Sequence, residues 1–569
     1  MSQNFSQLFL HPTIIIMSLS ALQELAPSFN FADVSVAAAA TGAVTTLYLN
    51  RNEYRGDTAV AVCALTWASL FGTGVYKQLG VSQSLGIATS GLASFLGTMI
   101  VLAVAYRLSP LHPLWRFPGP FLNKITSLKA MHMVSTGHRY LIIKDLHKKY
   151  GKFVRTGPNT LSIASVEAVH PIYTTAQSMD KSMAYRPGRA PVGGLFFTPE
   201  RNLHNIRRKA WAGAFSSKSL PKLLAVVDKR TKQMIKVMDK RRSADGVIDM
   251  SEIIRHWAYD LMAEMTFGAT SDVELMANGD PEDVSENAQN ATVVFEVLGE
   301  APSIFDIAWN LPASDEFHVL ERTATKLMDV RKHITGDDIA SYLLGEKGGD
   351  CLGDEDLNID SAFAIAAGSD TTGGTLTILL FYLLRDRTVY KKLRDELDAH
   401  FNSVDEIDDP KALLELPYLY GVIWEGLRLG TPFGGLPRVV GEGGSMIDGE
   451  FIPEDIIVSV PPYTQQTDPE HFYPMPMEFL PERWQPEGLG PETITKKDAM
   501  LCFSYGAFSC LGKVFANQEL HLTVAKLMLA YDMDLPKSFD QQKFMDGVLN
   551  MRTTLFAYPL AITATPRNL

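Results

Sequence analysis

Cysteine and positive charge are both in short supply in this 569-residue sequence, and each shortage excludes a class of protein. Acidic residues outnumber basic ones by 64 to 52, a formal net charge of -12, which excludes general nucleic-acid binding because that function needs a basic surface. The four cysteines are scattered and lack zinc-type pairing, which excludes a disulfide framework and indicates a reducing compartment: Cys63, Cys351, Cys502 and Cys510.

A glycine-rich phosphate-binding loop is also missing, so the chain does not carry a nucleotide or flavin domain of its own. A cleaved signal peptide is not expected, because no basic stretch precedes the first apolar segment. What the chain does have is an uneven distribution of apolar residues, since the first hundred residues are far more apolar than the rest.

Residues 1–108 are predicted to form a transmembrane region of three or four helices. Three apolar stretches, Phe31–Leu49, Thr58–Tyr76 and Leu85–Tyr106, are each close to the roughly 20 residues that cross a bilayer core. Their frequent glycine, alanine and threonine residues suit close packing between membrane helices. An earlier stretch, Leu8–Leu25, also contains polar residues and is interpreted as a fourth span or an interfacial helix.

The basic residues near these stretches predict their orientation. Arg51 and Arg55 lie between the first two stretches, whereas the next connection contains only Lys77. Since basic loops stay in the cytosol, three spans put the large C-terminal part on the cytosolic side. We therefore expect a multi-pass protein of the endoplasmic reticulum whose body faces the cytosol.

A proline-rich hinge at 109–120 separates this region from the body of the chain at 121–569, because prolines at this density give a stiff, extended connector. Short β-rich pieces occur at Phe153–Ile163, Val439–Val440 and Ile456–Val460, among many amphipathic helical stretches. The fold class predicted for the body is mainly α with small β-sheets.

A cysteine in a glycine-punctuated loop is the strongest chemical signal in the body. Gly506 and Gly512 flank Cys510, and they let the backbone approach a flat cofactor closely. The positive end of the helix expected after the loop favours a thiolate, which is a ligand for haem iron. Phe503 is expected to pack beside the sulfur. A cysteine near two glycines is more often an inert buried thiol, and Cys502 is interpreted that way.

An acidic and a hydroxyl side chain lie together inside a long apolar helical run. Asp370 and Thr371 are costly to bury there unless they have partners or a task. Ala367 and Gly368, just before them, leave room for something flat to lie against the helix. The alternative is a helix kink packed by neighbouring helices.

A third signal is a pair of opposite charges on one helical face. Glu425 and Arg428 are three residues apart and can pair. Their apolar neighbours indicate burial, where only a well-bonded ion pair survives.

These motifs resemble those of the cytochrome P-450 superfamily, in the family's order, from Pro110 to the C-terminus. The loop follows the pattern F-x-x-G-x-x-x-C-x-G, and the charged pair follows E-x-x-R. The resemblance implies a cytochrome P-450 fold preceded by the multi-span region, which is a departure because most members have one span. It also implies haem b (iron protoporphyrin IX) with Cys510 as the axial ligand of the iron.

The resemblance assigns roles to the other motifs. Asp370 would relay protons from solvent, and Thr371 would hydrogen-bond the dioxygen. Arg483 would complete a structural triad with Glu425 and Arg428, which holds the helix to the segment before the cysteine loop and does no chemistry.

Partners for the haem propionates are implied at three positions: cations at Arg438 and Arg208, and a hydrogen-bond donor at His204. Arg438 resembles the family's strand-entry arginine, and Arg208 resembles the arginine of a W-x-x-x-R motif in which His204 replaces the usual tryptophan. Arg207 and Lys209 are interpreted as a solvated helix face.

One departure concerns the cysteine loop itself. Phe508 stands where the family usually has arginine or histidine. One propionate contact is therefore missing, or it is supplied by Lys513 or by Arg438 and Arg208 alone.

The substrate pocket is implied to be largely apolar, which favours a hydrophobic small molecule; steroid, terpenoid, aromatic and fatty substrates all stay open. A fungal enzyme of secondary metabolism is the family-level analogy. The residues assigned to the pocket are Phe196, Phe197, Phe363, Ala367, Phe433 and Leu436.

The implied function is a monooxygenase that inserts one oxygen atom from O2 into its substrate. Electrons would come from a partner, NADPH–cytochrome P-450 reductase, in the same lipid membrane. The candidate docking residues are Lys209, Lys218, Lys222 and Lys513. Two alternatives are a haem-thiolate isomerase, dehydratase or peroxygenase, and a non-catalytic haem-binding membrane protein.

Overall fold

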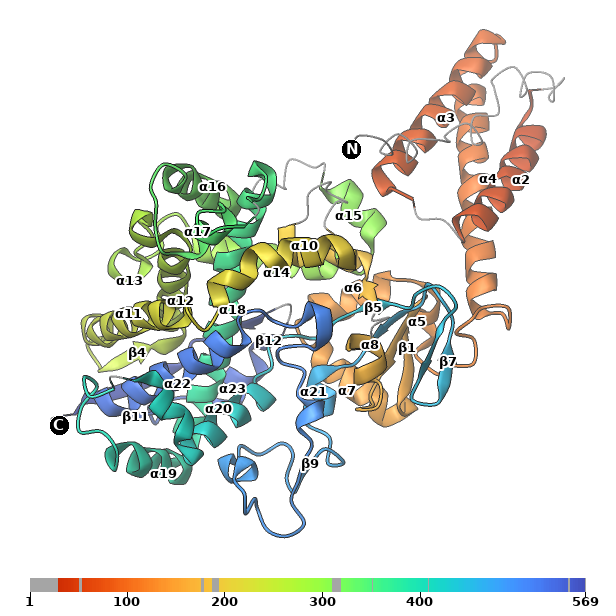
Figure 1. The fold of residues 1–569 in the computed structure, drawn as a ribbon. Coiled ribbons are helices and arrows are strands. Elements are labelled where there is room, and N and C mark those ends of the chain that lie inside the picture. The colour runs from red at the N-terminus through yellow and green to blue at the C-terminus, as the bar shows by residue number, and fades with distance from the viewer. Residues whose placement is uncertain are drawn as a thin grey trace. The chain divides into compact units, whose positions relative to one another are not determined.

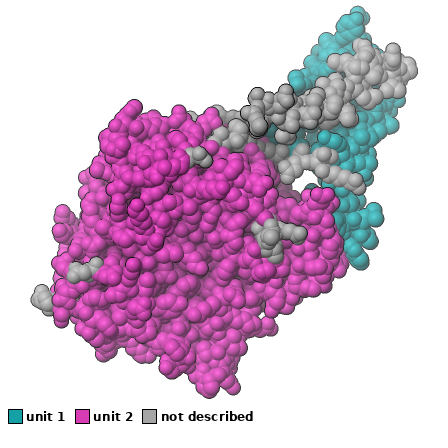
Figure 2. All heavy atoms as spheres, viewed as in Figure 1, with its two compact units in different colours: residues 1–115 teal, residues 116–569 magenta. Residues whose placement is uncertain are grey.

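The computed structural model describes residues 29–50, 54–174, 179–186, 194–309, 319–349, 351–407, 409–550 and 553–567. The chain divides into two compact units, Met1–Trp115 and Arg116–Leu569 (Figure 2). The boundary between them falls inside the segment 109–120, where the sequence predicts a hinge. The predicted stretch Leu8–Leu25 lies outside the described residues.

The first unit contains three long helices: α2 (Phe31–Leu49), α3 (Gly56–Tyr76) and α4 (Val81–Leu108). Each of them is long and apolar enough to cross a membrane. The three predicted apolar stretches therefore form helices as expected, and α4 extends beyond its predicted stretch at both ends.

Small residues let these three helices pack closely. A side-chain carbon added at Gly42 would lie 2.7 Å from the Phe95 carbonyl oxygen, and one added at Gly74 would lie 2.6 Å from the Ser84 hydroxyl oxygen. Helix α4 therefore approaches both α2 and α3 at glycines, as helices packed in a bilayer commonly do.

The second unit is mostly helical (Figure 1). Its helices are α5 (Phe121–Ile125), α6 (Leu128–Ser135), α7 (Arg139–Tyr150), α8 (Val169–Tyr173), α9 (Gly194–Phe197), α10 (Arg201–Ala212), α11 (Leu220–Lys240), α12 (Met250–Phe267), α13 (Leu275–Asn278), α14 (Val284–Gly299), α15 (Pro302–Ala308), α16 (Val319–Arg331), α17 (Ile339–Leu343), α18 (Asp354–Arg385), α19 (Arg387–Asp398), α20 (Pro417–Leu429), α21 (Pro462–Gln466), α22 (Lys513–Ala530) and α23 (Gln541–Asp546).

The strands of this unit are short, and most belong to small sheets. They are β1 (Phe153–Gly157), β2 (Thr160–Ile163), β3 (Asp180–Lys181), β4 (Val247–Asp249), β5 (Arg438–Val439), β6 (Ser445–Ile447), β7 (Glu450–Ile452), β8 (Ile457–Ser459), β9 (Phe472–Tyr473), β10 (Ile494–Thr495), β11 (Tyr531–Asp534), β12 (Val548–Asn550), β13 (Thr554–Phe556) and β14 (Ala561–Pro566).

The largest sheet unites the three β-rich pieces predicted from the sequence. Its strand order is β1-β2-β8-β5-β3. Strands β2 and β8 run parallel, and the other neighbours run antiparallel. Because β5 pairs with β3 at the edge, Lys181 lies directly opposite Arg438. The remaining strands form a three-stranded sheet, β11-β14-β4, and three two-stranded sheets.

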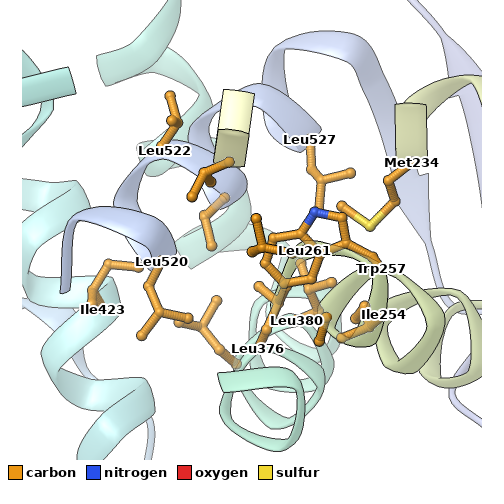
Figure 3. Packing of buried hydrophobic residues seen from close by; sticks show 14 of the residues in the cluster. Met234, Ile254, Trp257, Leu261, Leu376, Leu380, Ile423, Leu520, Leu522 and Leu527 are labelled. Carbon is orange, nitrogen blue, oxygen red and sulfur yellow. The ribbon is translucent and has the colours of Figure 1, made fainter. Parts of the chain in front are cut away.

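The long helix α18 organises the core of the second unit. It contacts α9, α12, α16, α20 and α22. Three acidic residues in its first turn and Arg385 in its last complement the helix dipole. Its C-terminal half is buried almost all round, so Leu376 and Leu380 pack with Trp257 of α12 and Leu527 of α22 (Figure 3). Helix α22, which follows the cysteine loop, is thereby held in one rigid core with α12 and α18.

Candidate functional site

The cysteine loop has the backbone geometry of a tight, preformed turn. The Cys510 N–H donates to the Phe503 carbonyl oxygen at 2.8 Å, and α22 begins at Lys513, three residues later. Gly506 has φ +68°, and any side chain there would overlap the Tyr173 carbonyl oxygen. Glycine at this position is therefore required by both the backbone conformation and the close approach of α8.

Cys510 is an exposed residue, although the protein atoms around its thiol desolvate that group. This desolvation raises the pKa of Cys510, while the N–H groups of Gly512 and Lys513 and the positive charges of Arg208 and Lys513 lower it. The N–H groups and positive charges that lower this pKa would also stabilise a thiolate when a metal cation binds the sulfur. Cys502 is buried, and burial raises its pKa to about 12, so it is an inert packing thiol as expected.

Helix α10 fixes one side of the loop through Arg208, and the neighbouring Arg207 anchors the same helix to α18. Arg208 donates to the Ser509 carbonyl oxygen at 2.7 Å, next to Cys510. The interpretation of Arg207 as part of a solvated face is wrong, because Arg207 is buried and pairs with Asp356 at 2.5 Å in the first turn of α18. Helical spacing brought Arg207 inward on the same side as His204, whereas Lys209 is exposed.

Three basic side chains surround the ring of Phe508, two residues before the cysteine. The His204 ring lies edge-on to it at 4.5 Å between centroids. The Lys181 Nζ lies 4.9 Å from its centroid and the Arg438 guanidinium carbon lies 5.0 Å from it. Lys181, which the sequence did not single out, belongs to this cluster because β3 pairs with β5.

This cluster has buried polar atoms that make no hydrogen bond within the described part of the chain. Among the described residues, His204 Nδ1 and Arg438 Nε are buried without a partner. Burial lowers the pKa of His204 to about 3, and Lys181, Arg208 and Arg438 add to this effect, so its imidazole is neutral. A thiol aligned with N–H groups, next to buried cations with unused donors, fits haem, which combines an iron with two carboxylates.

Helix α18 presents the predicted Asp370 and Thr371. Burial raises the pKa of Asp370 to about 7, although nearby Tyr259 and Arg255 oppose this. Asp370 also lines a polar cavity of about 230 Å³, and no described residue makes a well-formed hydrogen bond to its Oδ1. The Thr371 hydroxyl donates to the Ala367 carbonyl oxygen at 2.6 Å within the helix.

The expectation that Gly368 leaves room for a flat group is wrong. A side-chain carbon at Gly368 would overlap Met262 of α12, so this glycine permits the close crossing of α12 and α18. Ala367, the residue before it, is half-buried.

An acidic residue that sequence reasoning missed lies on α22. Glu519 is 2% exposed, burial raises its pKa to about 8, and its carboxylate accepts from the Thr372 hydroxyl at 3.3 Å. A glutamate inside the otherwise buried helical run after Cys510 was the available signal. The hydrogen bond between Thr372 and Glu519 links α18 to α22 beside Thr371.

Three of the four phenylalanines assigned to the pocket, Phe196, Phe197 and Phe363, gather into one cluster. The rings of Phe196 and Phe363 stack at 4.6 Å, and Phe197 lies edge-on to them at 5.2 and 5.7 Å. Phe295 of α14, which the sequence did not indicate, lies 5.9 Å from Phe197. A continuous apolar surface therefore borders α18 one turn before Ala367.

The other two pocket candidates lie in the segment before β5. Leu436 is buried, and its carbonyl oxygen accepts from the Tyr173 hydroxyl at 3.0 Å. Phe433 is half-buried, and within the described part of the chain it makes no ring contact with the aromatic cluster.

The charged triad is fully buried. Glu425 binds Arg428 at 2.6 and 2.8 Å, and Arg483 approaches the same carboxylate at 3.5 Å. Trp484, which the sequence did not assign, donates to Glu425 at 2.9 Å. Arg428 uses its remaining donors on the carbonyl oxygens of Gln466, Pro476 and Glu478. The structure thus brings the three predicted charges together at the junction of α20 with the segment before the cysteine loop.

Comparison with known proteins gives the site its context. The family model for cytochrome P-450 matches residues 118–557. Tryprostatin B 6-hydroxylase of Neosartorya fischeri is 28% identical over 77% of this chain and 79% of its own length. The cytochrome P-450 monooxygenase BipB of Cochliobolus sativus is 29% identical over 74% and 86%. The cytochrome P-450 monooxygenase orf5 of Eupenicillium brefeldianum is 30% identical over 84% and 96%. With the cysteine loop, the triad and α18 all inside the matched residues, this chain belongs to the cytochrome P-450 family.

Proposed function

We propose that this chain inserts one atom of O2 into a hydrophobic small organic molecule, with electrons from NADPH–cytochrome P-450 reductase. Membership of the family makes it a haem-thiolate monooxygenase, so the proposal concerns the substrate class and the electron donor. One oxygen atom enters the substrate and the other leaves as water, which consumes two electrons and two protons.

The observation that carries the proposal is the exposed residue Cys510 just before α22, beside a cluster of buried cations. Cys510 would be the axial ligand of haem b, and Arg438, His204 and Arg208 would serve the propionate side. A haem held by a thiolate supplies the O–O cleavage chemistry. Phe503, Gly506 and Gly512 shape the loop that carries the ligand.

Proton supply is the task we assign to Asp370. Its carboxyl lines a polar cavity and its pKa is raised to about 7, so it exchanges protons readily near neutral pH. Thr371 follows it in the helix, and its hydroxyl can pass a proton on after leaving its bond to Ala367. Glu519 of α22, which accepts a hydrogen bond from Thr372 of α18, is a second proton source beside Thr371.

The substrate proposed is hydrophobic because the residues expected to contact it are aromatic and apolar. The cluster of Phe196, Phe197 and Phe363 offers flat surfaces for an apolar molecule. One similar protein is named for hydroxylation of tryprostatin B, which supports a secondary-metabolism substrate for this chain as well.

The proposed electron donor is the reductase in the same membrane, which would dock through an acidic surface. Lys209, Lys218 and Lys513 are exposed and suit such a partner, whereas Lys222 pairs with Asp337 at 2.8 Å. The three apolar helices of the first unit would hold the chain in the endoplasmic reticulum membrane with the body in the cytosol.

The first experiment is a difference spectrum of reduced, carbon-monoxide-treated membranes that contain the full-length chain. A strongly red-shifted Soret band is expected for the wild type and for Cys502→Ser, and its loss is expected for Cys510→Ser. NADPH consumption with added reductase and a panel of hydrophobic compounds follows. A well-folded wild-type chain without the band would overturn the proposal.

A haem-thiolate isomerase or peroxygenase and a non-catalytic haem protein are distinguished by Thr371→Ala. In a monooxygenase this variant should consume NADPH with much less product, because proton delivery is disturbed. The two alternatives predict no change in that ratio.

A further inference from the structure

A buried asparagine on the hairpin β12–β13 uses only one end of its side-chain amide. Asn550 is 6% exposed, and its Nδ2 donates to the Thr431 carbonyl oxygen at 2.5 Å. Because a backbone carbonyl oxygen can only accept, this bond identifies the amide nitrogen and leaves the oxygen Oδ1 on the other side. Among the described residues, no group donates a hydrogen bond to Oδ1.

This oxygen borders the place where Gly434 lacks a side chain. A side-chain carbon added at Gly434 would lie 3.6 Å from Asn550 Oδ1, 3.8 Å from the Asn550 carbonyl oxygen and 3.9 Å from Arg139 Cδ. These are ordinary van der Waals distances, so a group of atomic size fits beside Gly434. A buried acceptor without a donor is costly, and a donor placed there would remove the cost.

The hairpin that carries Asn550 bridges two elements of the candidate site. The segment bonded by Asn550 Nδ2 joins α20 to β5, and β5 carries Arg438 beside the cysteine loop. On the other strand of the hairpin, Thr554 is paired with Asn550, and its Cβ lies 3.0 Å from a side-chain carbon added at Gly374 of α18. Gly374 follows Thr371 by about one helical turn. Asn550 is therefore held next to the elements to which the proposed function assigns haem and dioxygen.

The surroundings of this acceptor favour a neutral ligand. Leu549, the residue before Asn550, packs in an apolar cluster with α14. Arg139, which borders the same position, already pairs with Glu296 at 3.1 Å and with Glu300 at 2.7 Å. An anionic group would meet acceptor oxygens and a guanidinium that two carboxylates already neutralise. A neutral N–H or O–H group would instead meet an acceptor inside apolar surroundings.

We propose that Asn550 Oδ1 accepts a hydrogen bond from a neutral N–H or O–H group of the substrate. The substrate class is then a hydrophobic molecule that carries such a donor, and fatty acids bound as carboxylates are excluded. A single placed polar group in an apolar pocket fixes the orientation of the ligand and provides specificity. The inference rests on the proposed function, because it concerns the substrate of the same haem enzyme.

Binding of matched probes to the full-length, haem-loaded chain tests the proposal. The pairs carbazole and fluorene, and indole and indene, have nearly the same shape, but only the first member of each has an N–H group. The shift of the Soret band on titration gives each dissociation constant. The N–H member of each pair should bind about tenfold more tightly than its partner. Dodecanol should likewise bind more tightly than dodecanoic acid.

Asn550→Leu should lose the preference for the N–H members while keeping the red-shifted carbon monoxide band. Thr266→Val is the matched control and should keep the preference, because Thr266 of α12 is also buried and no described residue bonds its hydroxyl. Equal affinities within each pair in the wild type, a preference that survives Asn550→Leu, or tighter binding of dodecanoic acid would each overturn the inference.

A second pair of variants tests the oxygen without a ligand. Gly434→Ser places a hydroxyl beside Oδ1, whereas Gly434→Ala adds only the carbon that both variants share. Gly434→Ser should have the higher thermal midpoint, and this difference should vanish when each variant is combined with Asn550→Leu. Gly434→Ser should also lose the preference for the N–H probes, because an internal donor then occupies the oxygen. Equal midpoints for the two variants would overturn the inference.

Failure of this inference is distinguishable from failure of the proposed function. A wild-type chain without the red-shifted band would overturn the proposed function, and this inference with it. A wild-type chain that has the band but binds both members of each probe pair equally would overturn this inference alone.

Discussion

Two charged regions of the second unit differ in how their charges are matched. At the junction of Glu425 and Arg428, all the guanidinium donors of Arg428 bind the carboxylate or backbone carbonyl oxygens. Around Phe508, the cations Lys181 and Arg438 lie side by side, and Arg438 has no carboxylate partner among the described residues. Both regions are buried, so the charged side chains in both have lost their hydration.

The difference separates a charge cluster that completes the fold from one whose cations, under the proposed function, bind the haem propionates. A buried ion pair that satisfies itself is structural, and removing one partner leaves the other uncompensated. A buried group of like charges with unused donors is complete only when an anion is bound. Disturbing the first should therefore harm folding, and disturbing the second should harm haem retention.

The largest effect is expected at the junction. Glu425→Ala leaves Arg428 buried without its carboxylate, which costs about 3–5 kcal/mol of unfolding free energy. Little folded protein should be recovered, and the thermal midpoint of any that remains should fall sharply. A thermal midpoint within experimental error of the wild-type value would contradict the claim that this charge cluster stabilises the fold.

A glycine pair in the cysteine loop gives the next largest effect. Gly506→Ala forces a side chain into φ +68° and against the Tyr173 carbonyl oxygen, so backbone strain alone costs about 1–3 kcal/mol. Gly512→Ala is the matched control, because its side-chain carbon would lie at an ordinary 3.8 Å from the Cys510 sulfur. Equal thermal midpoints for the two variants would contradict this account of the loop.

Arg438→Leu should affect the ligand and spare the fold. Haem loss should accelerate about tenfold or more, because one charge-assisted contact is removed. The haem-free chain should be as stable as the wild type or more so, since Lys181 no longer faces a like charge. A loss of haem-free stability as large as that of Glu425→Ala would show that the two regions do not differ.

The smallest effect concerns Asp370, a buried acid outside both clusters. Its folded pKa of about 7 lies above the usual value, so its contribution to stability is fully present at low pH and is lost as pH rises through about 7. Asp370→Asn should therefore gain stability relative to the wild type on going from pH 5 to pH 8, by on the order of 1–3 kcal/mol.

Denaturant unfolding of the haem-free chain at the two pH values measures this effect. Asp145→Asn, at an exposed carboxylate, is the control and should show no such change. A pH-independent difference between Asp370→Asn and the wild type would mean that Asp370 is ionised in the folded chain.

Local patterns in the sequence were sufficient for much of this architecture. The three apolar stretches are helices, and the β-rich pieces at Phe153–Ile163 and Ile456–Val460 are strands of one sheet. The charges of Glu425 and Arg428 could be paired in advance because helical spacing puts residues three apart on one face. Glycines around Cys510 indicated a tight loop because few other residues adopt its backbone conformation.

Only the tertiary structure decided which distant residues share a surface. Gly368 faces Met262 because α12 crosses α18 there, and Arg207 is buried because α10 packs against the start of α18. No periodicity reports such crossings, since it describes one element at a time.

The sequence by itself determined the tight cysteine loop, the three apolar helices of the first unit and the internal charge pair, because each depends on residues close together in the chain. The partnership of Lys181 with Arg438 was decided by the pairing of β3 with β5, two strands of two residues each that carry almost no local signal. A short edge strand gains its position from the sheet that receives it, and with that position its lysine gains a place beside the cysteine loop.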